Sequence, residues 1–385
     1  MDCIRVHARG FFRFRGRNMR KTIEVGLLYA RSGTYSLISE VCRRGALQAI
    51  ADVNEDPDSP VTLVPVERDP AGNIDNYAPM CADILRQTSA RHIFGPTTSW
   101  SRKEVIPVLE KVGATLWYVV PYEGFEASDH VVYTHGCPNQ HLLPLLHWAM
   151  PRYGRRAYLT GSNYIWGWEL NRVARDVVTE AGGKVLGERH LALGSTDIGR
   201  MIDEISATGP DFVLNNLVGA SSYAFLRAFA DLGARDPRFA PARCPVLSCN
   251  LTECELSELG AASEGLISVG PHFAGSTAWQ NGAAAGFASS FEASAYAAMR
   301  RLAILLAAVP DAETLPLDQL LARTSHLHHG IDLETHHAAL PVLIAQVEQA
   351  RFVVREALGQ VLADPYLSRT DRRIDVPRPR LSVVK

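Results

Sequence analysis

The sequence predicts an α/β protein built of two doubly wound parallel-sheet lobes around a hinged cleft. Short apolar runs alternate with segments of helical periodicity, which is typical of parallel sheets covered by helices. This alternation restarts after about Pro138, and a chain of 385 residues is long enough for two cores. No Gly/Ser-rich or Pro-rich linker separates the two series, which favours hinged lobes over independently moving domains.

The first series alternates strand and helix from its start. The apolar run 23–29 predicts a strand, and apolar residues near helical spacing predict a helix over 38–53. Ser99 or Ser101 is a natural N-cap for the third helix. The further elements expected are a strand over 61–66, a helix over 77–86, a short strand at 92–95, a helix over 101–112 and a strand over 115–120.

The second series continues the same alternation and ends in a long helix. From about Asp332 the pattern weakens, and the arginine-containing and proline-containing residues 366–385 predict an extended tail. The elements expected are helices over 141–150, 168–181, 197–207, 221–232 and 283–307, and strands over 156–160, 184–193, 211–218, 245–248 and 266–269.

The N-terminal residues bear on the compartment. Residues 1–18 hold five arginines and no continuous apolar stretch of the kind a secretory signal needs. Either Met19 is the true start, or residues 1–21 form a disordered basic arm. Seven scattered cysteines are typical of reduced thiols. We therefore expect a cytoplasmic protein.

Charge and hydropathy argue against two classes of direct partner, nucleic acid and a membrane. The formal net charge is −2, which gives no electrostatic case for direct binding of nucleic acid. No apolar run reaches the roughly 18 residues of a membrane-spanning helix. We expect neither nucleic acid nor a membrane as a direct partner.

Motifs of catalysis are missing from the sequence. There is no G-x-G-x-x-G, no G-x-x-x-x-G-K-[ST], no H-E-x-x-H and no G-x-S-x-G, so we expect no enzyme and no cofactor. The histidine-rich segment 326–337 is the one local metal candidate, but it lacks firm ligand spacing and is better interpreted as an exposed polar connection. Cys244, Cys249 and Cys254 also lack the spacing of a zinc knuckle.

Several segments share their order and spacing with one known family. Residues 118–126 read Tyr-Val-Val-Pro-Tyr-Glu-Gly-Phe-Glu, a turn directly after a predicted strand, where α/β proteins place ligands. The segments 26–33, 69–73, 95–103, 138–140 and 161–171 are further landmarks. Together they resemble the amide-sensing regulators of bacterial amidase operons and the related urea and short-chain-amide binding proteins of transporters. The similarity covers about residues 23–275 and persists weakly to Tyr366.

This resemblance implies the type I periplasmic-binding-protein fold, in which the chain crosses three times between two lobes. The lobes would then be discontinuous. We expect residues 22–136 plus 273–330 in lobe one, residues 137–272 plus 331–365 in lobe two, and residues 366–385 as the tail.

The resemblance also implies a ligand pocket between the lobes. Ser99 matches a position whose main-chain N–H and hydroxyl meet the ligand, and Tyr118 matches an aromatic wall. Tyr164 and Trp166 match two tyrosines of lobe two, and Asn250 falls near a threonine that completes the pocket. Such groups suit a small neutral amide. The alternative interpretation is that the aromatic residues are interlobe core and that Ser99 is an N-cap.

Some positions depart from the family pattern. Val120 stands where a threonine is expected, Thr97 stands where an aromatic residue is expected, and Trp166 replaces a tyrosine. Because unpaired buried polar groups are costly, a changed polar set predicts a changed ligand. We expect a bulkier or more apolar amide, or a nitrile-derived or aromatic compound.

The sequence leaves alternative functions open. The leading one is a cytoplasmic sensor that binds an amide-like ligand and regulates an amidase or nitrile-hydratase operon through an RNA-binding antiterminator protein, with a homodimer as a possible assembly. The alternative is the substrate-binding protein of an ABC transporter for urea, short-chain amides or related solutes. An enzyme would need a reactive constellation in the cleft, and the residues do not supply one.

Overall fold

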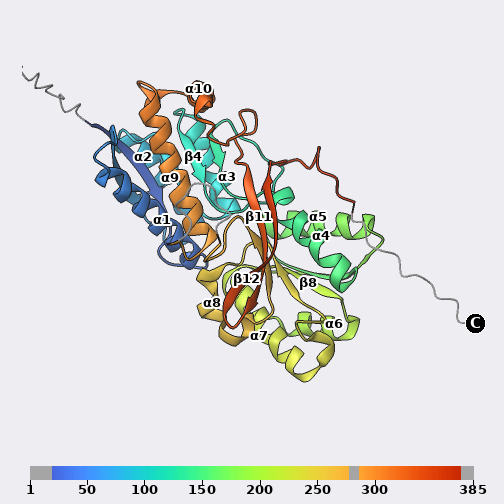
Figure 1. The fold of residues 1–385 in the computed structure, drawn as a ribbon. Coiled ribbons are helices and arrows are strands. Elements are labelled where there is room, and N and C mark those ends of the chain that lie inside the picture. Colours follow the sequence, from blue (N-terminus) through green and yellow to red (C-terminus); the bar gives the residue numbers. More distant parts are fainter. Residues whose placement is uncertain (1–19, 277–285, 374–385) are drawn as a thin grey trace, which may run out of the picture.

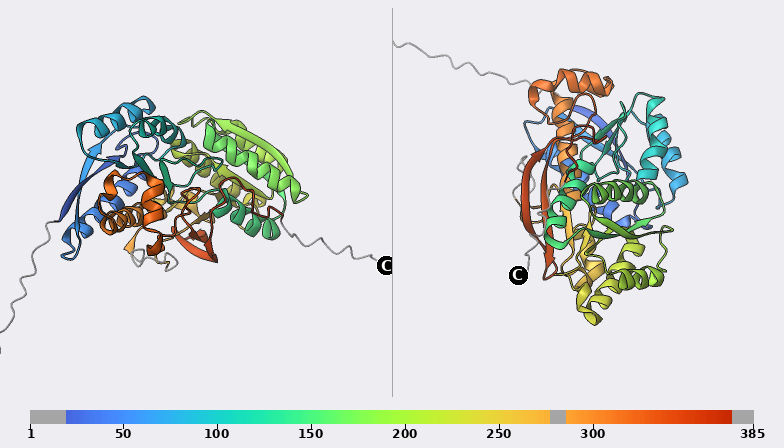
Figure 2. Two further views of the ribbon diagram at one scale, coloured as in Figure 1. Left: turned by 90° about the horizontal axis from the view of Figure 1, so that it is seen from above. Right: turned by 90° about the vertical axis from the view of Figure 1, so that its right-hand side faces the viewer.

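A computed structural model describes residues 20–276 and 286–373 of the chain. The expectations for residues 1–19, for 374–385 and for the start of the long helix at 283–285 lie outside these residues. Within them, the α/β fold class is confirmed: two sheets are each covered by helices on both faces (Figures 1 and 2).

The first sheet has five parallel strands in the order β2-β1-β3-β4-β5. Its strands are β1 (Lys21–Leu28), β2 (Val61–Arg68), β3 (His92–Phe94), β4 (Thr115–Tyr118) and β5 (Val131–Tyr133). Its helices are α1 (Ser36–Glu55), α2 (Tyr77–Gln87) and α3 (Ser99–Glu110), with the short η1 (Ile74–Asn76) before α2. β1 begins at Lys21, inside the arm expected to end there. Neither Ser99 nor Ser101 caps α3, because the side chain of Thr98 accepts the bond from the Ser101 N–H.

The second sheet has seven strands in the order β12-β11-β10-β9-β8-β6-β7. Five are parallel: β6 (Arg156–Ser162), β7 (Lys184–Leu191), β8 (Phe212–Asn216), β9 (Val246–Ser248) and β10 (Ile267–Gly270). Its helices are α4 (Leu142–Tyr153), α5 (Ile165–Glu180), α6 (Gly199–Thr208), α7 (Gly219–Arg235) and α8 (Glu253–Leu259). Short 3-10 turns are η2 (Pro138–Gln140), η3 (Pro237–Phe239) and η4 (Gly260–Ser263).

The remaining strands make this sheet mixed, which corrects the expectation of a wholly parallel sheet. β11 (Leu340–Glu348) runs antiparallel to β10, and β12 (Arg351–Val361) runs antiparallel to β11. The turn that joins them places Gln349 and Ala350 at φ 50° and 60°. Such turns normally use Asn-Gly or Asp-Gly, so the sequence gives no turn signal at this point.

The long helix α9 (Ser290–Ala308) leaves the second sheet and packs on α1 of the first (Figure 1). It begins at Ser290 with Ser289 as its N-cap, so the described residues 286–289, which were expected within the helix, precede it. The two helices approach so closely that a β-carbon at Gly45 would lie 2.2 Å from the Glu292 carbonyl oxygen. α10 (Leu317–Arg323), between η6 (Ala312–Thr314) and η7 (Ser325–Leu327), then leads to β11. The chain therefore passes between the two sheets three times.

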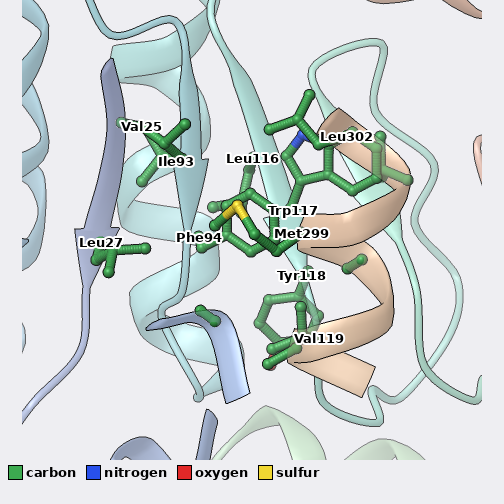
Figure 3. Close-up of a cluster of buried hydrophobic side chains, with 14 of the residues drawn as sticks. Val25, Leu27, Ile93, Phe94, Leu116, Trp117, Tyr118, Val119, Met299 and Leu302 are labelled. Atoms are coloured by element: carbon green, nitrogen blue, oxygen red, sulfur yellow. The ribbon is translucent and has the colours of Figure 1, made fainter. Parts of the chain in front are cut away.

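Each lobe has its own apolar core. In the first, strand residues pack between helices, and Met299 and Leu302 of α9 cover the stacked rings of Phe94 and Trp117 (Figure 3). In the second, one cluster lies under α4 and α5 and another under α6 and α7. No helix among the described residues is both long enough and apolar enough to cross a membrane.

Candidate functional site: a cleft between the lobes

A small cavity lies between the two lobes, at the carboxyl ends of strands from both sheets. Its volume is about 30 Å³. The loops after β1, β3 and β4 line it from the first sheet, and those after β6, β8 and β9 line it from the second. Ligands of open α/β sheets bind at this edge of the strands. The lining residues are Tyr35, Ile38, Thr97, Thr98, Ser99, Tyr118, Val120, Pro121, Tyr164, Trp166, Val218, Asn250 and Phe291.

All seven residues that the sequence singled out lie in this lining. They are Thr97, Ser99, Tyr118, Val120, Tyr164, Trp166 and Asn250. They come from both lobes, so only the tertiary structure brings them together. Their role in ligand binding stays a prediction.

The hydroxyls on the first-lobe side of the cavity already have partners within the protein. The Thr97 hydroxyl is 2.8 Å from that of Ser39. The Ser99 hydroxyl donates to Glu123 Oε2 at 2.6 Å. Since Ser99 is the first residue of α3, its backbone N–H has no partner within the helix and is available to an acceptor.

Behind this wall lies a buried ion-pair network. Arg102 is fully buried and donates to Glu123 at 2.7 Å and to Glu126 at 2.8 Å. Burial opposes its charge, but these carboxylates raise the pKa of Arg102 well above its ordinary value. Burial alone would raise the pKa of Glu126, but the positive charges of Arg102 and Lys103 and their hydrogen bonds lower it to about 2. The Arg102 guanidinium lies 4.7 Å from the centre of the Tyr118 ring and so supports that wall from behind.

The Pro-Tyr-Glu-Gly turn and the residues after it therefore lie mainly behind the cavity wall and stabilise it. Pro121 is part of the lining, whereas Glu123 and Glu126 hold Arg102. Gly124 has φ +80°, and a β-carbon there would lie 2.8 Å from the carbonyl oxygen of Pro365. This position requires glycine both for its backbone conformation and for the close approach of the C-terminal segment.

Aromatic side chains connect the two lobes across the cavity. The Tyr35 hydroxyl donates to that of Tyr164 at 2.8 Å, and the Trp100 ring meets the Tyr164 ring edge-on at 5.5 Å. Arg172 lies on α5, one helical turn after the exposed Trp168. Its guanidinium carbon is 4.7 Å from the centre of the Phe125 ring. These contacts join the two lobes across the cavity.

The second-lobe side offers a free hydrogen-bond donor. Trp166 is buried, and its indole N–H has no hydrogen-bond partner among the described residues. The Asn250 side-chain oxygen accepts from Ser248 at 3.0 Å. Burial raises the pKa of Tyr118 and Tyr164 above the ordinary value, so both phenols stay neutral at physiological pH.

Some lining residues were not anticipated from the sequence. Tyr35 could have been suspected, because it follows the first predicted strand in the same way that Ser99 follows a later one. Val218 could have been suspected on the same ground, since it lies just after β8, whereas Phe291 could not, since it enters from α9, whose relation to the cleft depends on the chain crossings.

His336 and His337 of the histidine-rich segment are buried and contribute to the fold, which corrects the expectation that the whole segment is an exposed polar connection. His337 hydrogen-bonds to the Tyr122 hydroxyl and its ring stacks on that of Tyr133, while His336 Nδ1 is 3.1 Å from the Ser128 carbonyl oxygen. In the part of the chain that the structure describes, no group of three His, Cys, Asp or Glu side chains could hold a metal ion.

Comparison with known proteins agrees with this architecture. Residues 23–372 match the model of the periplasmic binding protein domain. The chain belongs to this family. Among solved structures, a similar fold is found in the solute-binding protein of an ABC transporter from Rhodopseudomonas palustris HaA2 in complex with p-hydroxybenzoic acid. That protein is 20% identical, with 90% of this chain and 99% of that chain covered and a TM-score of 0.75.

A second similar structure is the branched-chain amino acid transporter substrate-binding protein of Streptococcus pneumoniae in complex with isoleucine. It is 13% identical, with 89% of this chain and 99% of that chain covered and a TM-score of 0.71. At these identities the likeness shows the fold, and the expected type I architecture of the periplasmic binding protein domain is confirmed. The narrower resemblance to amide-sensing regulators stays a prediction.

Proposed function

We propose that this protein binds a small uncharged organic ligand between its lobes and acts as a binding protein, not as an enzyme. The observation that carries the proposal is the chemistry of the lining: its side chains bear hydroxyls, an indole N–H, an amide and aromatic rings, and none of them is charged. The nearby charges of Arg102, Glu123 and Glu126 pair with one another. A ligand with a full charge would find no counter-charge in this lining.

Closure around the ligand is the proposed working motion. The cavity of about 30 Å³ has room for roughly two water molecules. A larger ligand therefore needs the lobes further apart than they are here, with the Tyr35–Tyr164 contact opened. A bound ligand would stabilise this arrangement, in which the lobes still contact the ligand from both sides, relative to a fully open one. Such a change is a population shift.

The ligand we favour is amide-like, and larger or more apolar than acetamide or urea. Val120 and the side chains of Tyr118, Tyr164 and Trp166 supply apolar and aromatic walls. Aromatic faces of this kind suit a ligand with an apolar or ring-bearing body and a polar head.

For the biological role we favour a solute-binding protein that delivers its ligand to an ABC transporter. The similarity to transporter binding proteins of the same fold supports this role. The second candidate is a cytoplasmic sensor that signals through an antiterminator protein, and the Pro121–Glu126 turn supports it by its resemblance to those regulators. Recovery of the native protein from the exported fraction would favour transport. Recovery from the cytoplasm as a complex with an RNA-binding protein would favour the sensor.

The binding proposal is tested by thermal unfolding of the full chain in the presence of small amides, ureas, nitriles, carboxylates and amino acids. A ligand that binds only the folded state raises the melting temperature. We expect a shift with an amide, a much smaller shift in Trp166→Ala, and an unchanged shift in Trp168→Ala. Trp168 is the matched control, because it lies on the same helix but is exposed and outside the lining. Shifts with amino acids alone would reject an uncharged ligand.

A further inference from the structure

Glu123 determines which way the hydrogen bond of Ser99 points. Its Oε1 accepts from Arg102 and its Oε2 accepts from the Ser99 hydroxyl at 2.6 Å. All three side chains are buried, with exposed fractions of 1% for Glu123, 0% for Arg102 and 3% for Ser99. As the anionic member of an ion pair, Glu123 can only accept. The one proton of the Ser99 hydroxyl is therefore committed to Glu123.

This commitment decides what Ser99 can offer to the cavity. A serine hydroxyl has one proton and two lone pairs. With the proton on the Glu123 side, Ser99 Oγ faces the cavity as an acceptor only. A ligand group that meets it must donate a hydrogen bond.

The opposite side of the cavity has the reverse polarity. The Trp166 indole N–H is a donor without a partner among the described residues. Tyr164 accepts from Tyr35, which leaves its own proton for another acceptor. Among the side chains, the cavity thus has an acceptor from one lobe and donors from the other, in addition to the backbone N–H of Ser99, so a head group that both donates and accepts satisfies both sides.

We propose that Glu123 is a specificity-determining residue that, by fixing Ser99 as an acceptor, makes the cleft select a carboxamide head group over a carboxylate of the same shape. The carboxamide donates its N–H to Ser99 and accepts on its carbonyl oxygen, whereas the carboxylate has no proton to donate and meets the Ser99 lone pairs. Glu123 acts through Ser99 and is not itself in the lining. This inference rests on the proposed binding function.

The test compares matched pairs of probes, acetamide with acetate and benzamide with benzoate, by titration calorimetry on the full chain. In the wild type we expect the carboxamide of a pair to bind at least tenfold more tightly than its carboxylate. In Glu123→Gln the Gln oxygen can still accept from Arg102, while its NH2 donates to Ser99 and frees the serine proton. We expect the amide-to-acid ratio to fall at least tenfold.

The controls separate a polarity effect from a structural one. Ser99→Ala should lose the preference, and adding Glu123→Gln to it should cause no further change. Trp168→Ala should leave the ratio unchanged, because Trp168 is exposed and lies outside the lining. If Glu123→Gln does not fold, the ratio in Ser99→Ala decides the matter alone.

The outcomes that overturn the inference are distinct from those that overturn the function. An equal loss of affinity for both probes in Glu123→Gln, or an unchanged ratio in Ser99→Ala, overturns the role of Glu123 while binding itself stands. Failure of the wild type to bind any probe, with no response in the thermal screen, overturns the proposed function and this inference with it.

Discussion

At the scale of single residues, Arg102 is the side chain that supports the first-lobe wall of the cleft. It pairs with Glu123 and Glu126, lies behind the ring of Tyr118, and indirectly orients Ser99 through Glu123. A buried charge is tolerated only where partners compensate it. The conspicuous Pro-Tyr-Glu-Gly turn supplies those partners.

Replacement of Arg102 by alanine should therefore be strongly destabilising, because it leaves the buried Glu123 carboxylate without its cation and removes one of the two cations that pair with the half-buried Glu126. We expect the free energy of unfolding to fall by about 3–5 kcal/mol. Lys103→Ala is the matched control, since Lys103 pairs with the same Glu126 but is 40% exposed, and should cost less than about 1 kcal/mol. Urea denaturation measures both, and a similar loss in the two variants would contradict this account.

At the scale of elements, the β11–β12 hairpin is the feature that the sequence did not predict. The strands are long and joined by a two-residue turn, yet Gln349 and Ala350 both have positive φ. These backbone conformations are sterically unfavourable for both residues, since only glycine adopts such φ values freely. Tertiary pairing with β10 holds the hairpin in place despite its turn.

Ala350→Gly should consequently stabilise the protein by about 1 kcal/mol, because glycine removes the steric cost of φ 60°. Gly359→Ala is the opposite test in the same hairpin. Gly359 has φ +69° and open space around it, so any loss comes from the backbone alone, and we expect about 1 kcal/mol of destabilisation. Thermal unfolding of the two variants checks the opposite signs, and shifts in the same direction would refute the explanation.

At the scale of the whole molecule, α8 of the second lobe packs against α1 of the first and carries the buried Glu255 and the half-buried Glu253. Burial raises the pKa of both Glu253 and Glu255 to about 7. Glu255 accepts from the Tyr223 hydroxyl, and Glu253 accepts from the Ala274 N–H. The junction of the lobes thus favours the protonated form of these groups.

This makes stability depend on pH with a definite sign. The unfolded chain loses these protons near pH 4.5 and the folded chain near 7, so between these values the unfolded state binds fewer protons. The contribution of both groups is present below about pH 4.5 and is lost as pH rises to about 7. Glu253→Gln should reduce the loss of unfolding free energy between about pH 4.5 and 7 by at least about 1 kcal/mol. Glu258→Gln, exposed on the same helix, should not, and denaturant titrations from pH 4.5 to 8 would reveal any failure of this prediction.

The sequence by itself determined the fold class and most of the elements, because apolar periodicity and strand–helix alternation are local properties. Its resemblance to the amide-sensing family also indicated the residues now found around the cavity. Ser99, Tyr118, Tyr164 and Asn250 each lie at or just after the end of a strand, and strand ends meet at one edge of a parallel sheet. Thr98 rather than Ser99 caps α3, because several hydroxyls compete within one turn and backbone geometry chooses among them.

Only the tertiary structure decided the rest. The mixed second sheet, the entry of Phe291 into the cavity and the burial of Arg102 depend on contacts between residues far apart in the chain. The same is true of the hydrogen bond from Ser99 to Glu123, which crosses 24 positions of sequence. Local patterns specify which residues face a core, but which distant partners a buried polar group finds is decided by how the elements pack.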